Sequence, residues 1–525
     1  MTTPAALSLR PWPRRALALL AGAVSALGFQ PYNLWPLALV GAAALTVAVA
    51  GLRLRTCFGL GYLYGLSFLT ITVGWAAVIA APVAVALVGF EALWFGLLAQ
   101  LLGTVVGSRL WPLWAAAGWV TVEYLYSRLP FGGFGWFRLG FAMADSPLAG
   151  LYPLVSVAGV SFLAALLAQL LAWVLVGRGS SRQPLVRLGA GLAAFALLAG
   201  SGLLARTVPL AAPSSQRAVT VGVVQGNVDG VTGVEAMGRA RSVTRNHLAE
   251  TVTLMARARS GQYPAPDLVL WPENSTDIDP VWDAETGAVV QTAVDLAQVP
   301  VLVGAVTEGP GEQERQTTAV WWDPQAGPGP RYHKRNLVPF GEWVPFRAQL
   351  LPLIPMLQLS GRQSVPGTGP GVLEVDVDGQ PLRVGVMICF ELAYDQTARE
   401  AVTGTGPDHG AQLLTVQSNN ATYAGTGQIP QQWAITRVRA MEARREILVA
   451  TTNAWSGYIR TDGQVVYRTE QRTADSYAVT VPVRDNLTLA VRYGAQIEAA
   501  LVLAGVGGLA VRVGAAWKNR SERSR

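Results

Sequence analysis

The sequence predicts a bundle of membrane-spanning α-helices joined to an exported α/β domain. The chain has 525 residues, of which 51% are hydrophobic and only 14% are charged, whereas about 25% charged residues are usual in soluble domains. Its charges are unevenly distributed, and its apolar stretches change from long to short near residue 207. These three observations exclude a purely soluble enzyme and a disordered chain, and the length implies two or more domains.

The basic residues are concentrated at the two ends of the chain. Residues 1–206 hold twelve arginines and three acidic residues, residues 207–506 carry a net charge of −6, and residues 507–525 carry +4. In a soluble protein the overall net charge of +7 would suggest a nucleic-acid partner. Here the arginines flank apolar stretches, so we expect no nucleic acid as a partner.

Eight apolar stretches have the length of membrane spans. The run 16–52 is interrupted at Gln30-Pro31-Tyr32-Asn33, and the run 56–108 near Ala81-Pro82, so each holds two spans. The other four are expected at 110–127, 152–177, 185–206 and 494–511. If the N-terminus is cytoplasmic, most arginines fall in cytoplasmic segments, as the positive-inside rule requires. We therefore expect both termini in the cytoplasm and the acidic central part on the other side.

From Arg217 onward the pattern changes to short β-rich runs between turns rich in Gly, Pro and Asp. Strands are expected at 218–225, 267–271, 300–306, 317–322, 382–389, 411–417 and 447–452, and helices at about 234–259 and 426–446. Continuous Val, Leu and Ile runs mixed with helices predict a buried α/β sheet. The expected domains are a membrane domain at 1–206, an exported catalytic domain at 207–493, and a final span with a basic tail at 494–525.

Three ends of these strands carry reactive side chains. Glu273 lies in Trp-Pro-Glu-Asn-Ser after one apolar run, Lys334 in Tyr-His-Lys-Arg-Asn, and Cys389 in Met-Ile-Cys-Phe-Glu after another. In α/β sheets, functional side chains gather where strands end. The three positions therefore form one candidate site.

Cysteine and lysine usage single out two of the three residues. Cys57 falls in a predicted span and Cys389 in the exported domain, so neither a structural disulfide nor a cysteine metal site is expected. A small buried hydrophobic role for Cys389 remains open. Lys334 and Lys518 are the only two lysines among 40 basic residues. A compact ammonium can approach a developing oxyanion more closely than a planar guanidinium can.

A nucleophilic thiol also needs a base. His333 adjoins Lys334, but neighbouring side chains on a strand face opposite ways, so a Cys-His pair is not favoured. A carboxylate whose pKa is raised by burial can serve instead. The resulting hypothesis makes Glu273 the general base and acid, Lys334 the oxyanion stabiliser and Cys389 the acyl-forming nucleophile.

The motifs WPE, YHKRNLVPFGE and ICFE, in that order, resemble those of the carbon–nitrogen hydrolase (nitrilase) superfamily with its Glu-Lys-Cys triad. Their placement after seven spans and before an eighth resembles the apolipoprotein N-acyltransferases of bacterial inner membranes. Three further segments are similar to that family, namely GFQPYNLWP at 28–36, VEYLYSRLPFGGFGWFRLG at 122–140 and VQGN at 224–227.

The resemblance implies an αββα sandwich, a periplasmic catalytic domain and no cofactor. It implies a two-step transfer, in which Cys389 takes a fatty acyl chain from a phospholipid and passes it to the α-amine of a diacylated apolipoprotein. Glu342, in the FGE motif, would orient Lys334, and Glu391 would be a further supporting carboxylate. The sequence shows no metal or nucleotide motif, so no metal is expected.

One segment of the chain differs from the family's sequence, and this difference suggests which residues bind substrate. The family reads Ser-Asn-Asp-Ala-Trp-Phe-Gly where this chain has Ser-Asn-Asn-Ala-Thr-Tyr-Ala at 418–424, with Thr422 in place of the Trp. Tyr423 or Trp455 would supply the missing aromatic wall. Trp343 begins an apolar, proline-broken stretch at 343–358, which we expect to contact lipid.

Two other interpretations remain open. A membrane-tethered amidase would use the same triad with water as second nucleophile. A transporter or receptor with a non-catalytic insert would instead depend on intramembrane charges, for which Glu91 and Glu123 are the candidates.

Overall fold

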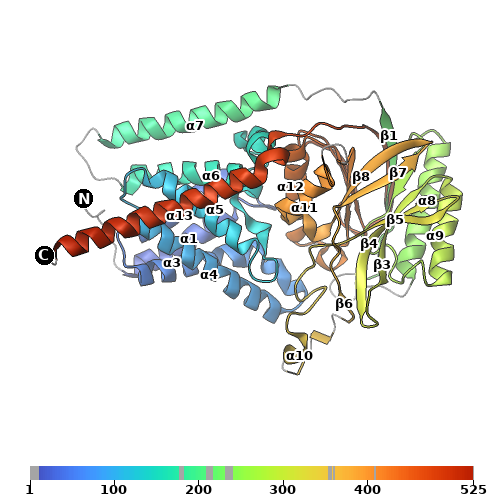
Figure 1. Cartoon of the computed structure of the whole chain (residues 1–525), viewed down its shortest axis with the longest axis horizontal. Coiled ribbons are helices and arrows are strands. Elements are labelled where there is room, and N and C mark those ends of the chain that lie inside the picture. The colour runs from blue at the N-terminus through green and yellow to red at the C-terminus, as the bar shows by residue number, and fades with distance from the viewer. Residues whose placement is uncertain are drawn as a thin grey trace. The chain divides into compact units, whose positions relative to one another are not determined.

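The computed structural model describes residues 11–176, 183–208, 217–230, 241–352, 357–358, 361–406 and 410–523. The chain forms two compact units (Figure 1). The first comprises Met1–Pro209 and Arg492–Arg525, and the second comprises Leu210–Val491. Each unit is described by itself below.

The described part of the first unit is helical. Its helices are α1 (Pro11–Ala26), α2 (Trp35–Val49), α3 (Leu54–Thr72), α4 (Ala81–Val105), α5 (Trp111–Tyr126), α6 (Tyr152–Val176), α7 (Gln183–Thr207) and the greater part of α13 (Leu489–Arg523). Each of the eight predicted apolar stretches contains or overlaps one of these helices. Among the described residues, four helical segments are long and apolar enough to cross a membrane, namely Ala81–Val105, Pro147–Val176, Leu185–Thr207 and Leu489–Gly514.

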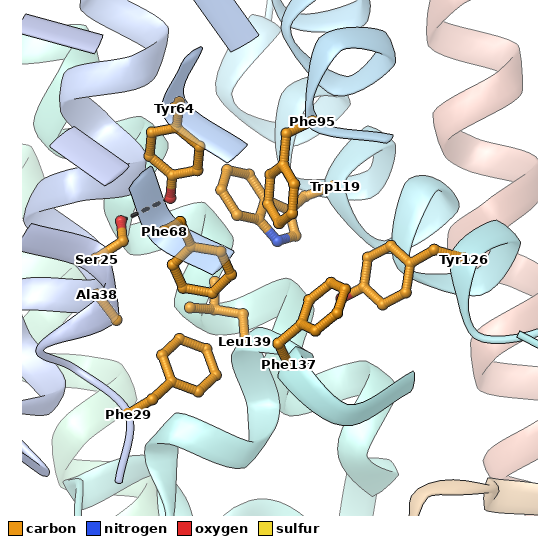
Figure 2. Close-up of a pocket in the computed structure, with 10 residues that line it drawn as sticks. All are labelled: Ser25, Phe29, Ala38, Tyr64, Phe68, Phe95, Trp119, Tyr126, Phe137 and Leu139. Carbon is orange, nitrogen blue, oxygen red and sulfur yellow. Dashed lines mark hydrogen bonds between the residues drawn. The ribbon is translucent and has the colours of Figure 1, made fainter. Parts of the chain in front are cut away.

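The interior of the first unit holds a pocket lined by aromatic side chains (Figure 2). Tyr64 and Phe68 come from α3, Phe95 from α4, and Phe137 from the segment that follows α5. The Tyr64 hydroxyl donates a 2.6 Å hydrogen bond to Ser25 of α1. The Gly- and aromatic-rich segment 131–141 thus contributes to the interior of this unit.

One arginine of that segment is buried between two carboxylates. The Arg138 side chain is 2% exposed and lies 3.6 Å from Glu123 of α5 and 3.7 Å from Glu498 of α13. Glu123 also accepts the backbone N–H of Leu139 at 2.7 Å. These contacts hold the segment 131–141 to two helices of the unit.

The second unit is built on two β-sheets. The seven-stranded sheet has the order β13-β1-β2-β3-β4-β5, with β6 paired to β4, and the six-stranded sheet has the order β12-β11-β10-β9-β8-β7. The first contains β1 (Ala218–Gln225), β2 (Leu268–Leu270), β3 (Val301–Glu308), β4 (Glu314–Asp323), β5 (Gly327–His333), β6 (Gln363–Ser364) and β13 (Asp475–Pro482). The second contains β7 (Val372–Val377), β8 (Gln380–Ile388), β9 (Leu413–Ser418), β10 (Ile447–Thr451), β11 (Gly457–Ile459) and β12 (Val465–Arg468).

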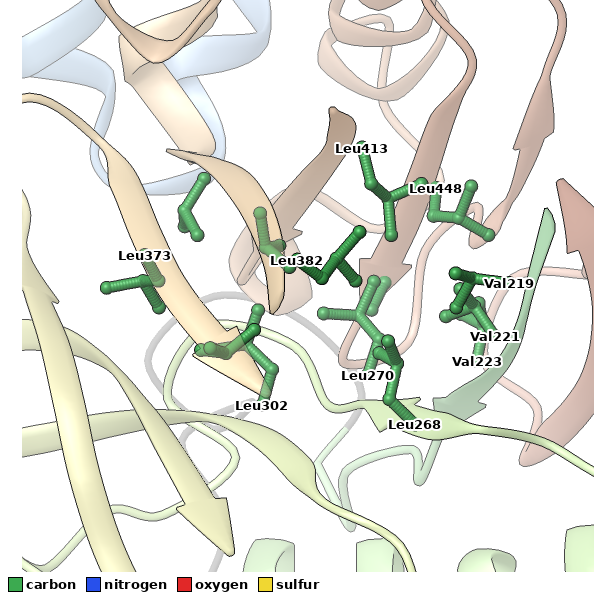
Figure 3. Packing of buried hydrophobic residues seen from close by; sticks show 14 of the residues in the cluster. Val219, Val221, Val223, Leu268, Leu270, Leu302, Leu373, Leu382, Leu413 and Leu448 are labelled. Carbon is green, nitrogen blue, oxygen red and sulfur yellow. The ribbon is translucent and has the colours of Figure 1, made fainter. Parts of the chain in front are cut away.

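The two sheets pack face to face and helices cover their outer faces. One buried cluster joins Val221 and Leu270 of the first sheet to Leu382 and Leu413 of the second (Figure 3). A second cluster joins the outer face of the first sheet to α8 (Ser242–Arg259) and α9 (Ala284–Ala297). Helix α11 (Asp395–Thr403) contacts β8 and the turn after it, and α12 (Gln428–Ala443) contacts that turn. Apolar side chains on both faces of each sheet explain the continuous Val, Leu and Ile runs in the sequence.

All seven expected strands are present, as β1 to β4 and β8 to β10. Both expected helices are present as α8 and α12, although residues 234–240 of the first lie outside the described residues. The sequence analysis did not identify β5 to β7, β11 to β13, α9 or α11. Most of these strands are short, rich in Gly and Pro, or alternately exposed, so they form no continuous apolar run. β13 is longer, but serine and threonine interrupt its apolar residues.

Candidate functional site

Glu273, Lys334 and Cys389 each follow a strand. Glu273 lies just beyond β2, Lys334 is the first residue after β5, and Cys389 is the first residue after β8. The first two strands belong to one sheet and β8 to the other. Cys389 has a positive φ of 51°, a conformation that non-glycine residues adopt rarely and mostly at functional sites.

Lys334 is held between two carboxylates. Its Nζ lies 2.9 Å from Oε1 of Glu273 and 2.9 Å from Oε1 of Glu342, and its side chain is 2% exposed. Burial alone would lower the pKa of Lys334, but the two carboxylates outweigh burial and hold this pKa well above its ordinary value. The ammonium therefore stays charged in a site from which water is largely excluded.

Glu273 is buried with both of its oxygens bound. Oε1 accepts from Lys334, and Oε2 accepts the backbone N–H of Asn419 at 2.7 Å. Burial raises the pKa of Glu273, Lys334 offsets part of this shift, and the nearby Glu342 carboxylate adds to it. A carboxylate with a raised pKa is a stronger base than an exposed glutamate.

Cys389 as a residue is partly exposed, in contrast to the buried Glu273 and Lys334. Burial of the sulfur and the charge of Glu273 raise the pKa of Cys389 to about 12, although Lys334 acts in the opposite direction. At neutral pH the thiol is thus protonated, and it needs a base at the moment of attack. Since the charges of both Glu273 and Lys334 act on the sulfur, the three residues form one electrostatic unit.

Ser418 and a cluster of amide side chains lie behind the sulfur. β8 and β9 run parallel with Ile388 opposite Gln417, which places Ser418 beside Cys389, and the Ser418 hydroxyl is hydrogen-bonded to the thiol. The Gln432 carbonyl oxygen accepts from the amides of Asn420 and Gln428, at 2.8 Å each. The Gln432 amide therefore donates to Ser418 Oγ, at 2.7 Å. The Ser418 hydroxyl thus accepts from Gln432 through its oxygen and can donate its single proton to the sulfur of Cys389.

Glu391 braces the two loops that carry Lys334 and Cys389. It is fully buried, and Oε1 accepts from the Tyr332 hydroxyl and from the backbone N–H of Arg335, at 2.7 Å each. Oε2 accepts the backbone N–H of Ile388 at 2.8 Å. Glu391 thus fixes the backbone on either side of the site, and these contacts give it a positioning role.

Glu342 contacts Lys334, as the resemblance implies.

The three aromatic residues that are expected to bind substrate, Tyr423, Trp455 and Trp343, lie in different surroundings. Tyr423 is close enough to Cys389 that the two side chains influence each other electrostatically, and its pKa is raised by burial first and by Cys389 second. Trp455 packs edge-on against Trp433, with ring centroids 6.1 Å apart. Trp343 is half-buried and accepts a backbone hydrogen bond from Phe340. Residues 353–356 of the predicted lipid-contacting stretch lie outside the described residues.

Sequence reasoning missed the contributions of Asn419 and of the amide cluster. The signal was present as a polar run, Gln417-Ser418-Asn419-Asn420, at the end of an apolar strand, and as the glutamines that begin α12. Buried polar residues need partners, so such a run at a strand end indicates a hydrogen-bonded network near a site. The partners came from elements distant in sequence and could not be assigned.

The arrangement is suited to covalent acyl chemistry. A partly exposed cysteine, a buried glutamate and a fixed ammonium follow strands from both sheets, and these are the kinds of group that nucleophilic catalysis with oxyanion stabilisation uses. Among the residues that the structure describes, no group of three or more His, Cys, Asp or Glu side chains is placed to hold a metal ion.

Comparisons with known proteins agree with this chemistry. Residues 21–170 match the family described as "Apolipoprotein N-acyltransferase N-terminal domain", and residues 220–485 match "Carbon-nitrogen hydrolase". A protein of Mycolicibacterium smegmatis named apolipoprotein N-acyltransferase is 36% identical, over 93% of this chain and 83% of its own length. One of the same name from Bordetella bronchiseptica is 30% identical, over 94% and 95% respectively.

Among solved structures, an amidase of the nitrilase superfamily from Nesterenkonia aligns with 50% of this chain and 92% of its own at 15% identity and a TM-score of 0.36, a similarity too low to bear on activity. The two family matches together span most of the chain, and the Mycolicibacterium relative extends over nearly all of it. The chain therefore belongs to the apolipoprotein N-acyltransferase family, whose members are acyltransferases with a carbon–nitrogen hydrolase domain.

Proposed function

We propose that this acyltransferase moves a fatty acyl chain from a phospholipid, through a thioester on Cys389, to the N-terminal α-amine of the diacylglyceryl-cysteine of an apolipoprotein. The observation that carries the proposal is the position of Lys334, held at 2.9 Å by two carboxylates next to a partly exposed cysteine. The names of the relatives support an apolipoprotein acceptor and the transfer of an acyl group to nitrogen.

In the first half-reaction, the Cys389 sulfur attacks the carbonyl carbon of the donor ester. Glu273 accepts the thiol proton as the S–C bond forms, and the Lys334 ammonium stabilises the negative charge that develops on the carbonyl oxygen. The C–O bond then breaks, and Glu273 returns the proton to the leaving glycerol oxygen. The products are an acyl-Cys389 thioester and a lysophospholipid.

In the second half-reaction, the α-amine of the acceptor attacks the thioester in its neutral form, after the ammonium has lost a proton to solvent. Glu273 takes a proton from the amine, the same cation stabilises the oxyanion, and the C–S bond breaks to release an amide. The sulfur regains its proton from Glu273. Glu342 positions the ammonium of Lys334 throughout, and Glu391 positions the backbone beside both residues.

The membrane arrangement is part of the proposal. Eight membrane spans would place both termini in the cytoplasm and the second unit in the periplasm, in a bacterial inner membrane. Arginines at the predicted cytoplasmic ends of the helices support this orientation. A donor that resides in the membrane accounts for a multi-span unit in the same chain as a hydrolase-like domain.

The direct test is mass spectrometry of the full-length protein after incubation with phospholipid vesicles. We expect an acyl adduct on the peptide that contains Cys389, its absence in Cys389→Ala, and unchanged thermal unfolding of that variant. An adduct that forms equally in Cys389→Ala would contradict the assignment of the nucleophile. Glu273→Gln should acylate slowly, because its amide cannot accept the thiol proton.

A second experiment separates transfer from hydrolysis. Acylated protein is mixed with a diacylated lipopeptide that carries a free α-amine, or with the same peptide acetylated at that amine. Transfer to the free amine only is the expected result. Release of free fatty acid at equal rates with both peptides would indicate the amidase-like alternative, and retention of all activity in Cys389→Ala would indicate a non-catalytic domain.

A further inference from the structure

Two arginines lie on one loop at the end of the sheets where the triad is found. Arg468 ends β12, and Arg472 follows in the connection to β13. Both side chains are exposed, and neither forms an ion pair with a carboxylate of the described residues. Glu470, which lies between them in the sequence, is also exposed and pairs with neither.

The Arg472 backbone is fixed close to the general base by a short series of contacts. Its N–H donates to the carbonyl of Asn453 at 2.7 Å. The residue before Asn453, Thr452, donates its hydroxyl to Asn419 at 3.1 Å. Asn419 in turn donates its N–H to Glu273 at 2.7 Å. One bonded step and two hydrogen bonds therefore connect Asn453 to Glu273.

The Arg472 side chain extends toward the segment that contains Tyr423. Its guanidinium donates to the carbonyl of Ala424, the residue after Tyr423, at 2.8 Å. Arg472 has a positive φ of 61°, and its carbonyl accepts from the Asn227 amide at 3.3 Å. A strained backbone that is held by hydrogen bonds on both sides presents its side chain in a fixed place.

Arg468 is held by stacking. Its guanidinium lies 4.0 Å from the centroid of the Trp455 ring, and Trp455 is supported from another direction by Trp433. Stacking uses the face of the guanidinium and leaves the N–H groups along its edge free to bind an anion. Trp455, which the sequence predicts as part of an aromatic wall, thus also contacts a guanidinium.

We infer that Arg468 and Arg472 bind the phosphate group of the phospholipid donor at the rim of the site. The inference rests on the proposed function and extends it to headgroup recognition. Guanidinium groups bind phosphate through paired charge-assisted hydrogen bonds. The acceptor presents a positively charged α-amine, which two unpaired arginines repel, so the charge of the rim matches the donor and not the acceptor.

The test compares two acyl donors on the full-length protein in mixed micelles. One donor is phosphatidylglycerol, and the other is a p-nitrophenyl ester of the same fatty acid, which has no phosphate. The variant is the double substitution Arg468→Gln/Arg472→Gln. Arg460→Gln, at an exposed arginine on the adjacent hairpin turn, is the matched control. The rate of acyl-Cys389 formation is measured against donor concentration.

We expect the double variant to raise the apparent KM for phosphatidylglycerol about tenfold, the effect of losing hydrogen bonds to a charged group. Acylation by the p-nitrophenyl ester and the Arg460→Gln control should be unchanged. Equal losses with both donors, or an unchanged KM for the phospholipid, would overturn the inference. Inorganic phosphate can be added as a competitor of the phospholipid. If it inhibits the unsubstituted protein but not the double variant, while the KM for the phospholipid is the same in both, the inference would also be overturned, because the arginines would then bind free anions only.

This design also separates the inference from the function on which it rests. If the unsubstituted protein forms no acyl-Cys389 with either donor, the proposed function fails. If it is acylated by both donors and only the expected KM change is missing, the proposed function stands and phosphate recognition by the rim is rejected.

Discussion

Both units of the chain bury a cation between two carboxylates, but they do so in different ways. In the second unit Lys334 is hydrogen-bonded to Glu273 and Glu342 at 2.9 Å each, beside a partly exposed cysteine. In the first unit Arg138 lies 3.6 to 3.7 Å from Glu123 and Glu498, and its side chain is 2% exposed. A compact ammonium can be shared closely by two acids and still face a reacting atom, whereas a wide guanidinium joins chain segments.

Removal of the cation should impair a different property in each of the two units. A buried pair that loses one partner leaves an uncompensated charge. In the second unit the loss should appear mainly in the rate of the reaction, and in the first unit mainly in stability. The following predictions test this difference.

The largest effect is expected for Lys334→Met. Without the ammonium, the oxyanion has no cation, and one of the two carboxylates takes up a proton and no longer serves as a base. We expect the rate of acyl-Cys389 formation to fall about 10⁴-fold, as when one member of a catalytic triad is lost. Lys334→Arg keeps the charge but not the shape, and near-normal activity in that variant would contradict the argument from shape.

Arg138→Met should lower the stability of the full-length protein by about 3–5 kcal/mol, because the buried Glu123 loses its cation, whereas Glu498 keeps its 2.6 Å ion pair with Arg128. The measurement is thermal or denaturant unfolding in detergent, together with the acylation rate of the fraction that remains folded. That rate should be unchanged. Adding Glu123→Gln to Arg138→Met should restore part of the stability, and a catalytic defect without destabilisation would contradict the comparison.

Glu342→Gln should lower activity about tenfold, since Lys334 loses one charge-assisted hydrogen bond. It should also change the pH dependence. Glu273 acts as a base only when deprotonated, so activity falls as the pH drops below its raised pKa. The Glu342 carboxylate contributes to that raised pKa, and its removal should move the acid limb of the pH–rate profile to lower pH. An acid limb that stays in place would argue against coupling between the two carboxylates.

The smallest effect is expected for Gln432→Met, which removes the donor that orients Ser418. We expect alkylation of Cys389 by iodoacetamide to slow about fivefold, the effect of one hydrogen bond. Gln431→Met, at a buried glutamine next to it on α12, is the matched control. If Gln432 acts through Ser418, Gln432→Met should have no further effect in a Ser418→Ala background, and additive effects would indicate a merely structural role.

The sequence was informative wherever local pattern and chemistry coincide. Continuous apolar runs located β1, β8 and β9, and the ends of such runs located Glu273 and Cys389. By contrast, β5 reads Gly-Pro-Gly-Pro-Arg-Tyr-His, which locally resembles a turn, and it forms a strand only because β4 pairs with it. The site shows the same limit, since Glu391 and Gln432 act through partners that the fold brings from distant segments.

The pairing of β1 with β13 has a consequence for how such a chain can be assembled. These strands are the first and last of the second unit, they run antiparallel, and Ala218 lies opposite Pro482. Adjacent strands are about 4.8 Å apart, so the polypeptide enters and leaves this unit at nearly the same place. A domain whose two ends lie this close together can be inserted into a short loop of another protein, because the segments on either side of that loop stay in place.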